Sequence, residues 1–334
     1  MLQIFEGKNF HNISLPDIFY TPKYIEIFSK YEDGEPLFFY YENDKGKVFS
    51  PFIKRKIKSN NFFDISTPYG CGGLLVESQD KHSLTKEFYK ELKIFLLDNK
   101  IVAEFGRLHP YFFDKSLIQE NFITNFVTFS VFIDLREKFE KIVKNLRRDH
   151  RARIKRAIKE GVEVKISRED RDIEIFYTLY IETMRRKNAR DFYFFPLWLI
   201  KELVSSFENA YIFIAFLKEI PISSSLFLSY NKFFHYFLTG SNFNYRNYGG
   251  NRIIIYEAIK FAKEKGFEIM HLGGGMKGED ELFLFKSGFS NWHLPYYVYG
   301  VIHNEKVYNE LVEERKKMGP IKDEFFFPLY RAPL

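Results

Sequence analysis

The residues best suited to electrostatic chemistry lie close together between Lys138 and Lys159. This segment holds ten lysines and arginines against two acidic residues, a balance of +8, whereas the whole chain carries only +6. Arg148 and Lys155 lie within it. Such a density of cations is typical of a surface that binds the phosphates of RNA, of a nucleotide or of an anionic membrane. It is equally typical of the solvated face of an ordinary helix, and the sequence leaves both interpretations open.

Familiar catalytic and metal-binding motifs are absent from the sequence. It contains no Gly-x-Ser-x-Gly elbow, no Walker loop and no His-Glu-x-x-His pair. Cys71 is the single cysteine and has no neighbouring histidine, which argues against a cysteine nucleophile and a disulfide framework. His271 precedes Glu279 and Asp280, but without a second close histidine we predict no metal site. The ordinary pKa of His109 would suit a general base, although a histidine before a proline more often has a structural role.

Length and composition indicate a folded protein of two domains. The chain has 334 residues, of which 46% are hydrophobic and 28% charged, and it has no polar low-complexity tract. Its N-terminus lacks the features of a signal peptide, and no uncharged apolar run is long enough to span a membrane. A chain with one cysteine suits a reducing compartment, so we expect it in the cytoplasm.

Hydrophobic periodicity predicts an α/β fold with a mixed sheet, in which similar elements occur in both halves. In the first half it indicates strands at 37–41, 48–54, 101–107 and 126–134, helices at 21–28 and 84–98, and a glycine-rich loop at 66–73. One basic amphipathic helix then ends before Gly161. The second half indicates strands at 162–167, 210–217, 222–230, 233–239 and 268–272, and helices at 173–186, 197–207 and 252–265. The shared order of elements suggests a duplicated fold.

Several short strings, in this order, resemble the FemABX family of peptidoglycan-bridge aminoacyltransferases and the related FemAB-like acetyltransferases. They are Asp64-x-x-x-Pro68-Tyr69-Gly70-x-Gly72-Gly73, Arg151-x-x-Ile154-x-x-Ala157-x-x-x-Gly161-Val162, Glu182-Thr183-Met184-x-Arg186, Leu272-Gly273-Gly274, Phe285-Lys286-x-Gly288-Phe289 and Phe327-Pro328-Leu329-Tyr330-Arg331. The resemblance implies two tandem GNAT-like domains, the first at 1–134 completed by 308–334 and the second at 135–307. The long helical arm that some members insert into the second domain has no counterpart here.

The family resemblance also implies an activity. FemABX-like proteins transfer an aminoacyl or acyl group to an amine of a nucleotide- or lipid-linked cell-envelope precursor. We therefore expect aminoacyl-tRNA or acyl-CoA as co-substrate, no tightly bound cofactor, tRNA as a potential partner and peripheral contact with a membrane surface. Two alternatives remain open: an acyl-CoA-dependent N-acetyltransferase acting on an amino sugar, and a noncatalytic module that binds RNA or phosphate.

Residues of the second domain acquire roles from this resemblance. Lys286 matches the family lysine that faces the acyl end of the donor, where a cation would stabilise the oxyanion, and Phe285 would wall the pocket. The competing interpretation is a solvated lysine next to an apolar segment. Arg186 matches an arginine that contacts diphosphate. The loop with Arg246, Gly249 and Gly250 is similar to the GNAT loop that binds pyrophosphate at a helix N-terminus, although Asn251 replaces its last small residue.

The first domain departs from the family pattern at two positions. Tyr69 lies in the glycine-rich loop expected to close the acceptor site. However, Phe28 stands where the family has a lysine that contacts a uridine diphosphate, and His109 precedes Pro110 where the family has Asp-Pro. The acceptor is therefore expected to differ from the UDP-linked muramoyl pentapeptide.

Overall fold

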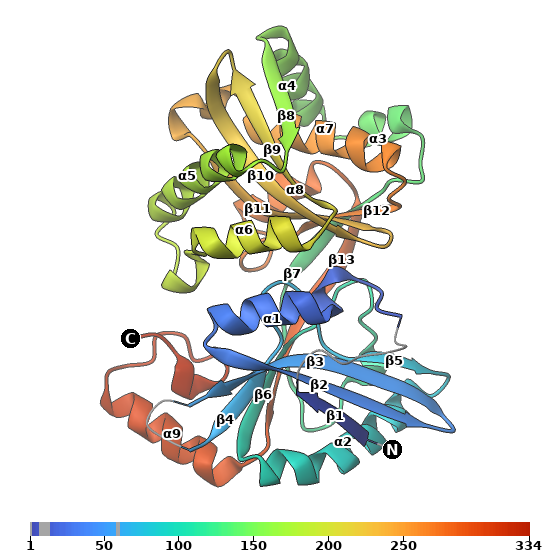
Figure 1. Cartoon of the computed structure of the whole chain (residues 1–334), viewed down its shortest axis with the longest axis vertical. Coiled ribbons are helices and arrows are strands. Elements are labelled where there is room, and N and C mark those ends of the chain that lie inside the picture. The colour runs from blue at the N-terminus through green and yellow to red at the C-terminus, as the bar shows by residue number, and fades with distance from the viewer. Residues whose placement is uncertain (1, 7–13, 58–60) are drawn as a thin grey trace. The chain divides into compact units, whose positions relative to one another are not determined.

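The computed structural model describes residues 2–6, 14–57 and 61–334 (Figure 1), so part of the N-terminal segment considered above lies outside the described residues. The chain forms two compact units. The first comprises Met1–Leu15, Phe19–Val127 and Tyr296–Leu334, and the second comprises Pro16–Ile18 and Thr128–Pro295. These divisions fall inside two long strands, whereas the predicted domain limits are at residues 134 and 308. Composition does not change within a continuous strand, so a division there leaves no signal in the sequence.

The first unit is built on a mixed sheet with the strand order β1-β2-β3-β4-β6-β13, and β5 pairs with β3. Its strands are β1 (Leu2–Glu6), β2 (Gly34–Asn43), β3 (Gly46–Lys56), β4 (Phe63–Ser66), β5 (Leu75–Ser78), β6 (Ile101–Arg107) and part of β13 (Trp292–Ile302). Its helices are α1 (Pro22–Tyr31), α2 (Lys81–Asp98) and α9 (Glu305–Lys317). The neighbours β4 and β6 are parallel, and β2 and β3 form an antiparallel hairpin.

Helix α2 shows why these residues fold as predicted. Leu84, Phe88, Leu92 and Leu96 recur every four residues, so they form one apolar stripe that packs against buried side chains of β2 and β3. The C-terminal segment belongs to the same unit. There the buried carboxylate of Asp64 accepts hydrogen bonds from Tyr330 and Arg331.

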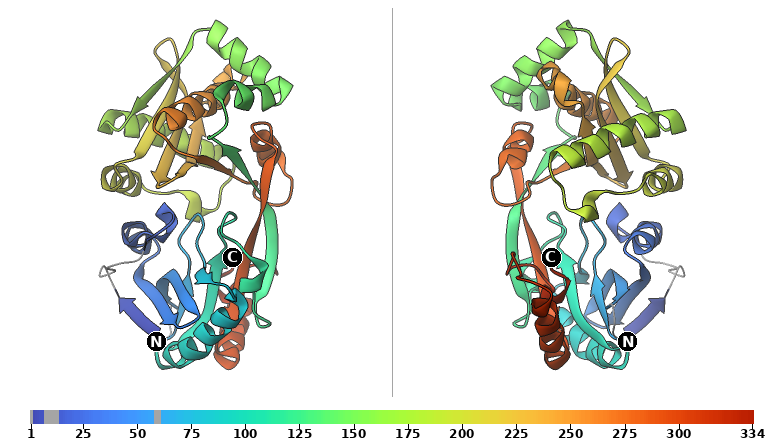
Figure 2. Two further views of the ribbon diagram at one scale, coloured as in Figure 1. Left: turned by 90° about the vertical axis from the view of Figure 1, so that its right-hand side faces the viewer. Right: turned by 90° about the vertical axis from the view of Figure 1, so that its left-hand side faces the viewer.

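The second unit has the strand order β7-β12-β11-β10-β9-β8. Its strands are part of β7 (Ile123–Asp134), β8 (Val162–Ser167), β9 (Ala210–Leu217), β10 (Ile220–Tyr230), β11 (Phe233–Ser241) and β12 (Ile269–Gly273). Its helices are α3 (Phe139–Asn145), α4 (Arg148–Lys159), α5 (Asp170–Arg186), α6 (Leu197–Ser206), α7 (Gly250–Glu264) and α8 (Glu281–Ser287). Helices α5 and α6 cover one face of this sheet, and α4 and α7 cover the other (Figure 2). Only β11 and β12 run parallel to each other as neighbours.

The single basic helix predicted before Gly161 is wrong, because this segment forms two helices. Leu146 and Arg147 are extended, and the backbone N–H of Arg147 donates to the carbonyl of Gly288 at 2.8 Å. That contact is distant in sequence, so local periodicity could not reveal the break. The predicted apolar stripe is largely buried, but Ile158 is 52% exposed. The predicted end of the segment is confirmed, since Gly161 adopts a positive φ of 77°.

Candidate active site

A glycine-rich loop follows β12 and receives a buried lysine. Lys286 lies on α8, only 9% of its surface is exposed, and its Nζ donates to the carbonyl of Gly274 at 2.8 Å. A Cβ on Gly274 would lie 2.5 Å from the carbonyl oxygen of Phe129, so only glycine fits there. The hydroxyl of Thr128 donates to the carbonyl of Gly278 at 2.6 Å and so holds the C-terminal end of the loop in place. The backbone therefore fixes one donor direction of the ammonium and leaves its other N–H groups for a ligand.

The electrostatics of Lys286 differ from those of a surface lysine. Burial lowers its pKa to about 8, and the carboxylate of Asp280 partly opposes this shift. Asp280 caps α8, accepting from the N–H of Phe283 at 2.9 Å and of Met276 at 2.6 Å. The interpretation of Lys286 as a solvated side chain is therefore wrong. It is a partly desolvated cation whose charge changes close to physiological pH.

Phe285 on α8 contacts residues of α4, of α7 and of the segment that follows α8. Its ring centroid lies 5.5 Å from that of His150 and 5.6 Å from that of Phe289, and the Arg252 guanidinium lies over it at 5.1 Å. Burial and the nearby charge of Arg252 lower the pKa of His150 to about 4. Phe285 thus packs between an imidazole and a guanidinium, and its predicted contact with the acyl group stays a prediction.

The predicted phosphate loop leads into helix α7. Gly249 is the N-cap with a φ of 72°, and it offers no side chain to the first N–H groups of the helix. A Cβ on Gly250 would lie 2.7 Å from the Cβ of Ser223, which explains the second glycine. The helix therefore presents uncapped N–H groups and its positive dipole end, the arrangement that favours an anion.

Two arginines predicted from separate motifs meet at the same ring. The guanidinium of Arg246 lies 4.2 Å and that of Arg186 lies 5.4 Å from the ring centroid of Phe243. Arg186 also donates to the carbonyl of Ser241 at 3.1 Å, and Phe243 is 51% exposed. The second unit thus brings both cations to the segment that precedes α7, where phosphates could reach them.

The basic surface of α4 adjoins this loop. A Cβ on Gly249 would lie 3.4 Å from the carbonyl of Arg153 on α4. The side chains of Arg148 and Lys155 are exposed, whereas Arg156 is paired with Glu160. Exposed cations next to an uncapped helix N-terminus extend the positive field beyond one phosphate group.

The predicted residues of the first unit have a different environment. His109 is 1% exposed, its Nδ1 accepts from the N–H of Tyr111 at 3.2 Å, and its ring centroid lies 4.6 Å from that of Phe112. Tyr69 is half-buried and stacks on the buried Phe28 at 6.1 Å. The predicted base role of His109 and acceptor role of Tyr69 stay predictions. The phenyl group of Phe28 belongs to the core.

Residues that complete the site were not identified from the sequence. Asp280, His150 and Arg252 are far apart in the chain and meet only through folding. The one available signal was Asp280, an acidic residue just before an apolar run, which is the pattern of a helix N-cap. Across residues 2–6, 14–57 and 61–334, no group of three or more His, Cys, Asp or Glu suits a metal ion. The same residues contain no helix that is long and apolar enough to cross a membrane.

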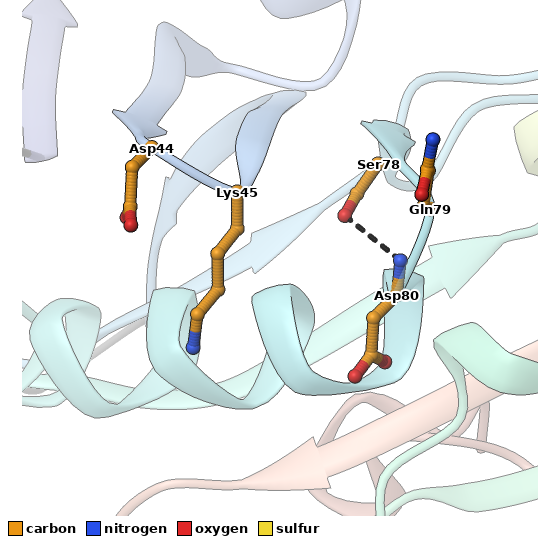
Figure 3. A pocket seen from close by; sticks show the side chains of 5 residues that line it. All are labelled: Asp44, Lys45, Ser78, Gln79 and Asp80. Atoms are coloured by element: carbon orange, nitrogen blue, oxygen red, sulfur yellow. Dashed lines mark hydrogen bonds between the residues drawn. The ribbon is translucent and has the colours of Figure 1, made fainter.

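The first unit also has a pocket, and it lies at the start of α2. Figure 3 shows its lining of Asp44, Lys45, Ser78, Gln79 and Asp80. The Oγ of Ser78 accepts from the N–H of Asp80 at 3.1 Å, and Oδ1 of Asp80 accepts from the N–H of Ser83 at 3.0 Å. The carboxylate of Asp80 thus occupies the position at which α2 would attract an anion.

Comparisons with known proteins agree with a candidate active site in the second unit. Residues 144–281 match the family model described as an acetyltransferase (GNAT) domain. The chain is similar in structure to FemX, with 15% identity and a TM-score of 0.66, covering 89% of this chain and 95% of that one. It is similar to L-PGS from Bacillus licheniformis, with 12% identity, a TM-score of 0.54 and coverages of 88% and 94%. It is also similar to a tandem GNAT protein from the clavulanic acid biosynthesis pathway, with 6% identity and a TM-score of 0.50. This match covers 91% of this chain and 99% of that one.

No curated protein was matched. At identities this low the structural likenesses establish the fold, and the domain match indicates the class of chemistry. The predicted resemblance to the FemABX proteins and the predicted α/β fold with tandem GNAT-like units are confirmed, and the interpretation as a noncatalytic module is set aside. The chain is an acyltransferase of the GNAT fold.

Proposed function

We propose that this protein transfers an aminoacyl or acyl group to an amine of a cell-envelope precursor, and that the second unit performs the chemistry. The buried ammonium of Lys286, held on the carbonyl of Gly274 at 2.8 Å, carries this proposal. Attack of an amine on an ester or thioester places negative charge on the carbonyl oxygen. A fixed cation in a poorly solvated site stabilises that charge without reorganising during the reaction.

The phosphates of the donor would bind within the same unit. The uncapped N-terminus of α7 would bind one phosphate through its N–H groups, and Arg246 and Arg186 would neutralise the next. Acyl-CoA and aminoacyl-tRNA both satisfy this requirement. The exposed cations of α4, including Arg148 and Lys155, favour the longer polyanion, so aminoacyl-tRNA is the preferred donor.

The acceptor is proposed from the family resemblance and from one departure. FemABX-like proteins act on nucleotide- or lipid-linked amines, and the first unit is expected to contact that part of the acceptor. Phe28, at the position of the family's diphosphate-binding lysine, is fully buried and carries no charge. The acceptor is therefore an amine on a carrier group that Phe28 does not recognise as a uridine diphosphate. The location of the protein in the cytoplasm remains part of this proposal.

The experiment that tests the proposed function is a comparison of donors. Acetyl-CoA, a set of aminoacyl-tRNAs and the matching uncharged tRNAs are added to the full chain, and thermal stabilisation is measured at several salt concentrations. A ligand at 100 times its dissociation constant adds about 2.7 kcal/mol to the free energy of unfolding. Stabilisation by aminoacyl-tRNA, weakened by Arg148→Glu with Lys155→Glu, is expected.

A second candidate function follows from the glycines before α7. An acyl-CoA-dependent N-acetyltransferase acting on an amino sugar would use Gly249 and Gly250 in the same way but would not need the cations of α4. Stabilisation by acetyl-CoA alone, unchanged by the charge reversals on α4, would favour this candidate. Stabilisation by neither donor class would contradict both.

A further inference from the structure

Three arginines of the second unit share a single carboxylate. Arg147 binds both oxygens of Asp149, with Nε 2.6 Å from Oδ1 and Nη2 3.2 Å from Oδ2. Arg252 on α7 has one nitrogen, Nη2, at 4.0 Å from Oδ2 of the same carboxylate. Arg153 lies exposed on α4, one turn after Asp149. The carboxylate of Asp149 is already bound by Arg147, so the cluster has an excess of positive charge.

Arg252 is a largely buried cation with an unsatisfied donor. Its Nε is buried and has no hydrogen-bond partner within the described residues. Burial and the positive charges of Arg153 and Arg147 lower its pKa, and the carboxylate of Asp149 opposes them only in part. A buried charge of this kind is unfavourable for the fold unless an anion is bound to it. The surroundings of Arg252 therefore favour an additional negative group.

The cluster adjoins two elements that are already assigned to the donor. Arg252 is the third residue of α7, and a Cβ on its N-cap, Gly249, would lie 3.4 Å from the carbonyl of Arg153. The guanidinium of Arg252 also lies 5.1 Å from the ring centroid of Phe285, the residue before Lys286. The side chain of Arg252 is 19% exposed, so it is not sealed within the core. The cluster thus borders both the anion site of α7 and the helix that carries Lys286.

We propose that Arg252 and Arg153 bind a further phosphate of the acyl donor, in addition to the phosphates assigned to the start of α7 and to Arg246. A guanidinium presents paired N–H groups that match two phosphate oxygens, and a phosphate supplies the negative charge that the cluster lacks. In aminoacyl-tRNA this group is a phosphodiester near the 3′ end, and in acyl-CoA it is the 3′-phosphate of the adenosine. The inference rests on the proposed function.

The test uses one substitution and a matched control. Arg252→Gln keeps an N–H donor but removes the charge, so it should weaken donor binding about 10- to 100-fold and leave turnover at saturating donor nearly unchanged. Its melting temperature should stay the same or rise, because an excess cation is removed, whereas loss of a purely structural arginine would lower it. Arg156→Gln is the control, since Arg156 lies on the neighbouring α4 but is paired with Glu160 at 2.8 Å.

Two pairs of probes identify the source of the phosphate. CoA is compared with 3′-dephospho-CoA, and a short RNA ending in CCA is compared with the same RNA carrying neutral methylphosphonates at its last linkages, by calorimetric titration at several salt concentrations. If the site binds RNA, Arg252→Gln should weaken only the charged RNA and reduce its salt slope by about 0.7. If it binds the 3′-phosphate of CoA, Arg252→Gln should weaken CoA and leave 3′-dephospho-CoA unaffected.

The remaining outcomes separate this site from the proposed function. Charged probes that bind equally to the wild type and to Arg252→Gln, or that are weakened equally by Arg156→Gln, would overturn the additional phosphate site and leave the transferase proposal intact. If the wild type binds neither CoA nor the RNA, the proposed donors fail, and inorganic pyrophosphate then tests the site alone. Thermal stabilisation of the wild type but not of Arg252→Gln by pyrophosphate would support the site, and stabilisation of neither would overturn it.

Discussion

Each unit places a glycine-rich loop after a strand, and the two loops satisfy their carbonyls with different groups. In the first unit, tyrosine hydroxyls donate to the carbonyls of Gly72, Tyr69 and Gly70 at 2.8, 2.7 and 3.2 Å. In the second unit, the ammonium of Lys286 donates to Gly274. A hydroxyl completes a backbone hydrogen bond and remains neutral, whereas an ammonium adds a charge that can act on a substrate. The loop of the first unit therefore receives neutral donors, whereas the loop of the second unit receives a cation that is suited to catalysis.

Two helix N-termini show the same contrast. Asp80 caps α2 with its own carboxylate, whereas Gly249 leaves the N-terminus of α7 without a side-chain cap. The second unit thus retains both an anion site and a buried cation. The GNAT domain match over residues 144–281 covers the anion site and ends at the first residue of α8, so it lies within the second unit.

The largest effect is expected at Lys286. Lys286→Met keeps the length and apolar packing of the stem but removes the charge, so turnover should fall about 100- to 1,000-fold while the fold is kept. The control is Tyr296→Phe in the first unit, which removes one hydroxyl from a loop carbonyl and should leave turnover within about twofold. Equal turnover in both variants would remove the contrast between the loops.

A backbone contact makes the second loop the less tolerant of change. Gly274→Ala would place a Cβ 2.5 Å from a backbone oxygen, so it should lower the free energy of unfolding by about 3 kcal/mol. Gly72→Ala would place a Cβ 3.1 Å from the side chain of Thr67 and 3.9 Å from the carbonyl oxygen of Arg107, an ordinary contact, so it should cost less than half as much. Urea titrations of both variants measure the difference. Similar losses would show that the two loops are equally constrained.

The helix N-termini give a smaller effect that separates binding from stability. Arg246→Gln should weaken donor affinity about tenfold, because it removes one charge-assisted contact to phosphate, and should leave stability unchanged. Asp80→Ala should do the opposite, lowering the free energy of unfolding by about 1 kcal/mol and leaving donor affinity intact. Calorimetric titration and thermal unfolding of the pair measure both quantities. A donor affinity that falls with Asp80→Ala would contradict the contrast.

The smallest expected effect concerns a tyrosine of the first loop. Tyr24→Phe removes the donor to the carbonyl of Tyr69 and should cost about 1 kcal/mol of stability. Acceptor kinetics should remain normal if the hydroxyl is only structural. A raised Michaelis constant for the acceptor without loss of stability would instead give this loop the acceptor role predicted for Tyr69.

The sequence revealed what depends on nearby residues. The helix at 84–98 and the strands at 222–230 and 233–239 follow from hydrophobic periodicity, and the structure has all three. Contacts between distant residues were not predictable from one sequence. The break at Leu146 and Arg147 depends on Gly288, and the bond between Asp17 and His235 joins residues 218 positions apart. The lysine was found only through its motif, and its burial required the fold.

The central claim is that Lys286 acts as a buried cation, and its pH dependence tests this most directly. Its pKa is lowered to about 8 from 10.5, so it loses its proton in the folded protein before it would in the unfolded chain. Between about pH 8 and 10.5 the unfolded state binds more protons, and the free energy of unfolding of the wild type relative to Lys286→Met should therefore rise with pH by up to about 3 kcal/mol.

Turnover should change in the opposite direction, falling as pH rises through about 8, because the neutral amine cannot stabilise an oxyanion. The decisive measurement is turnover and unfolding free energy of the wild type and Lys286→Met at the same series of pH values. A fall in wild-type turnover near pH 8 while its relative stability rises is the predicted result. Turnover that rises through pH 8, or is equal in the two proteins, would contradict the account.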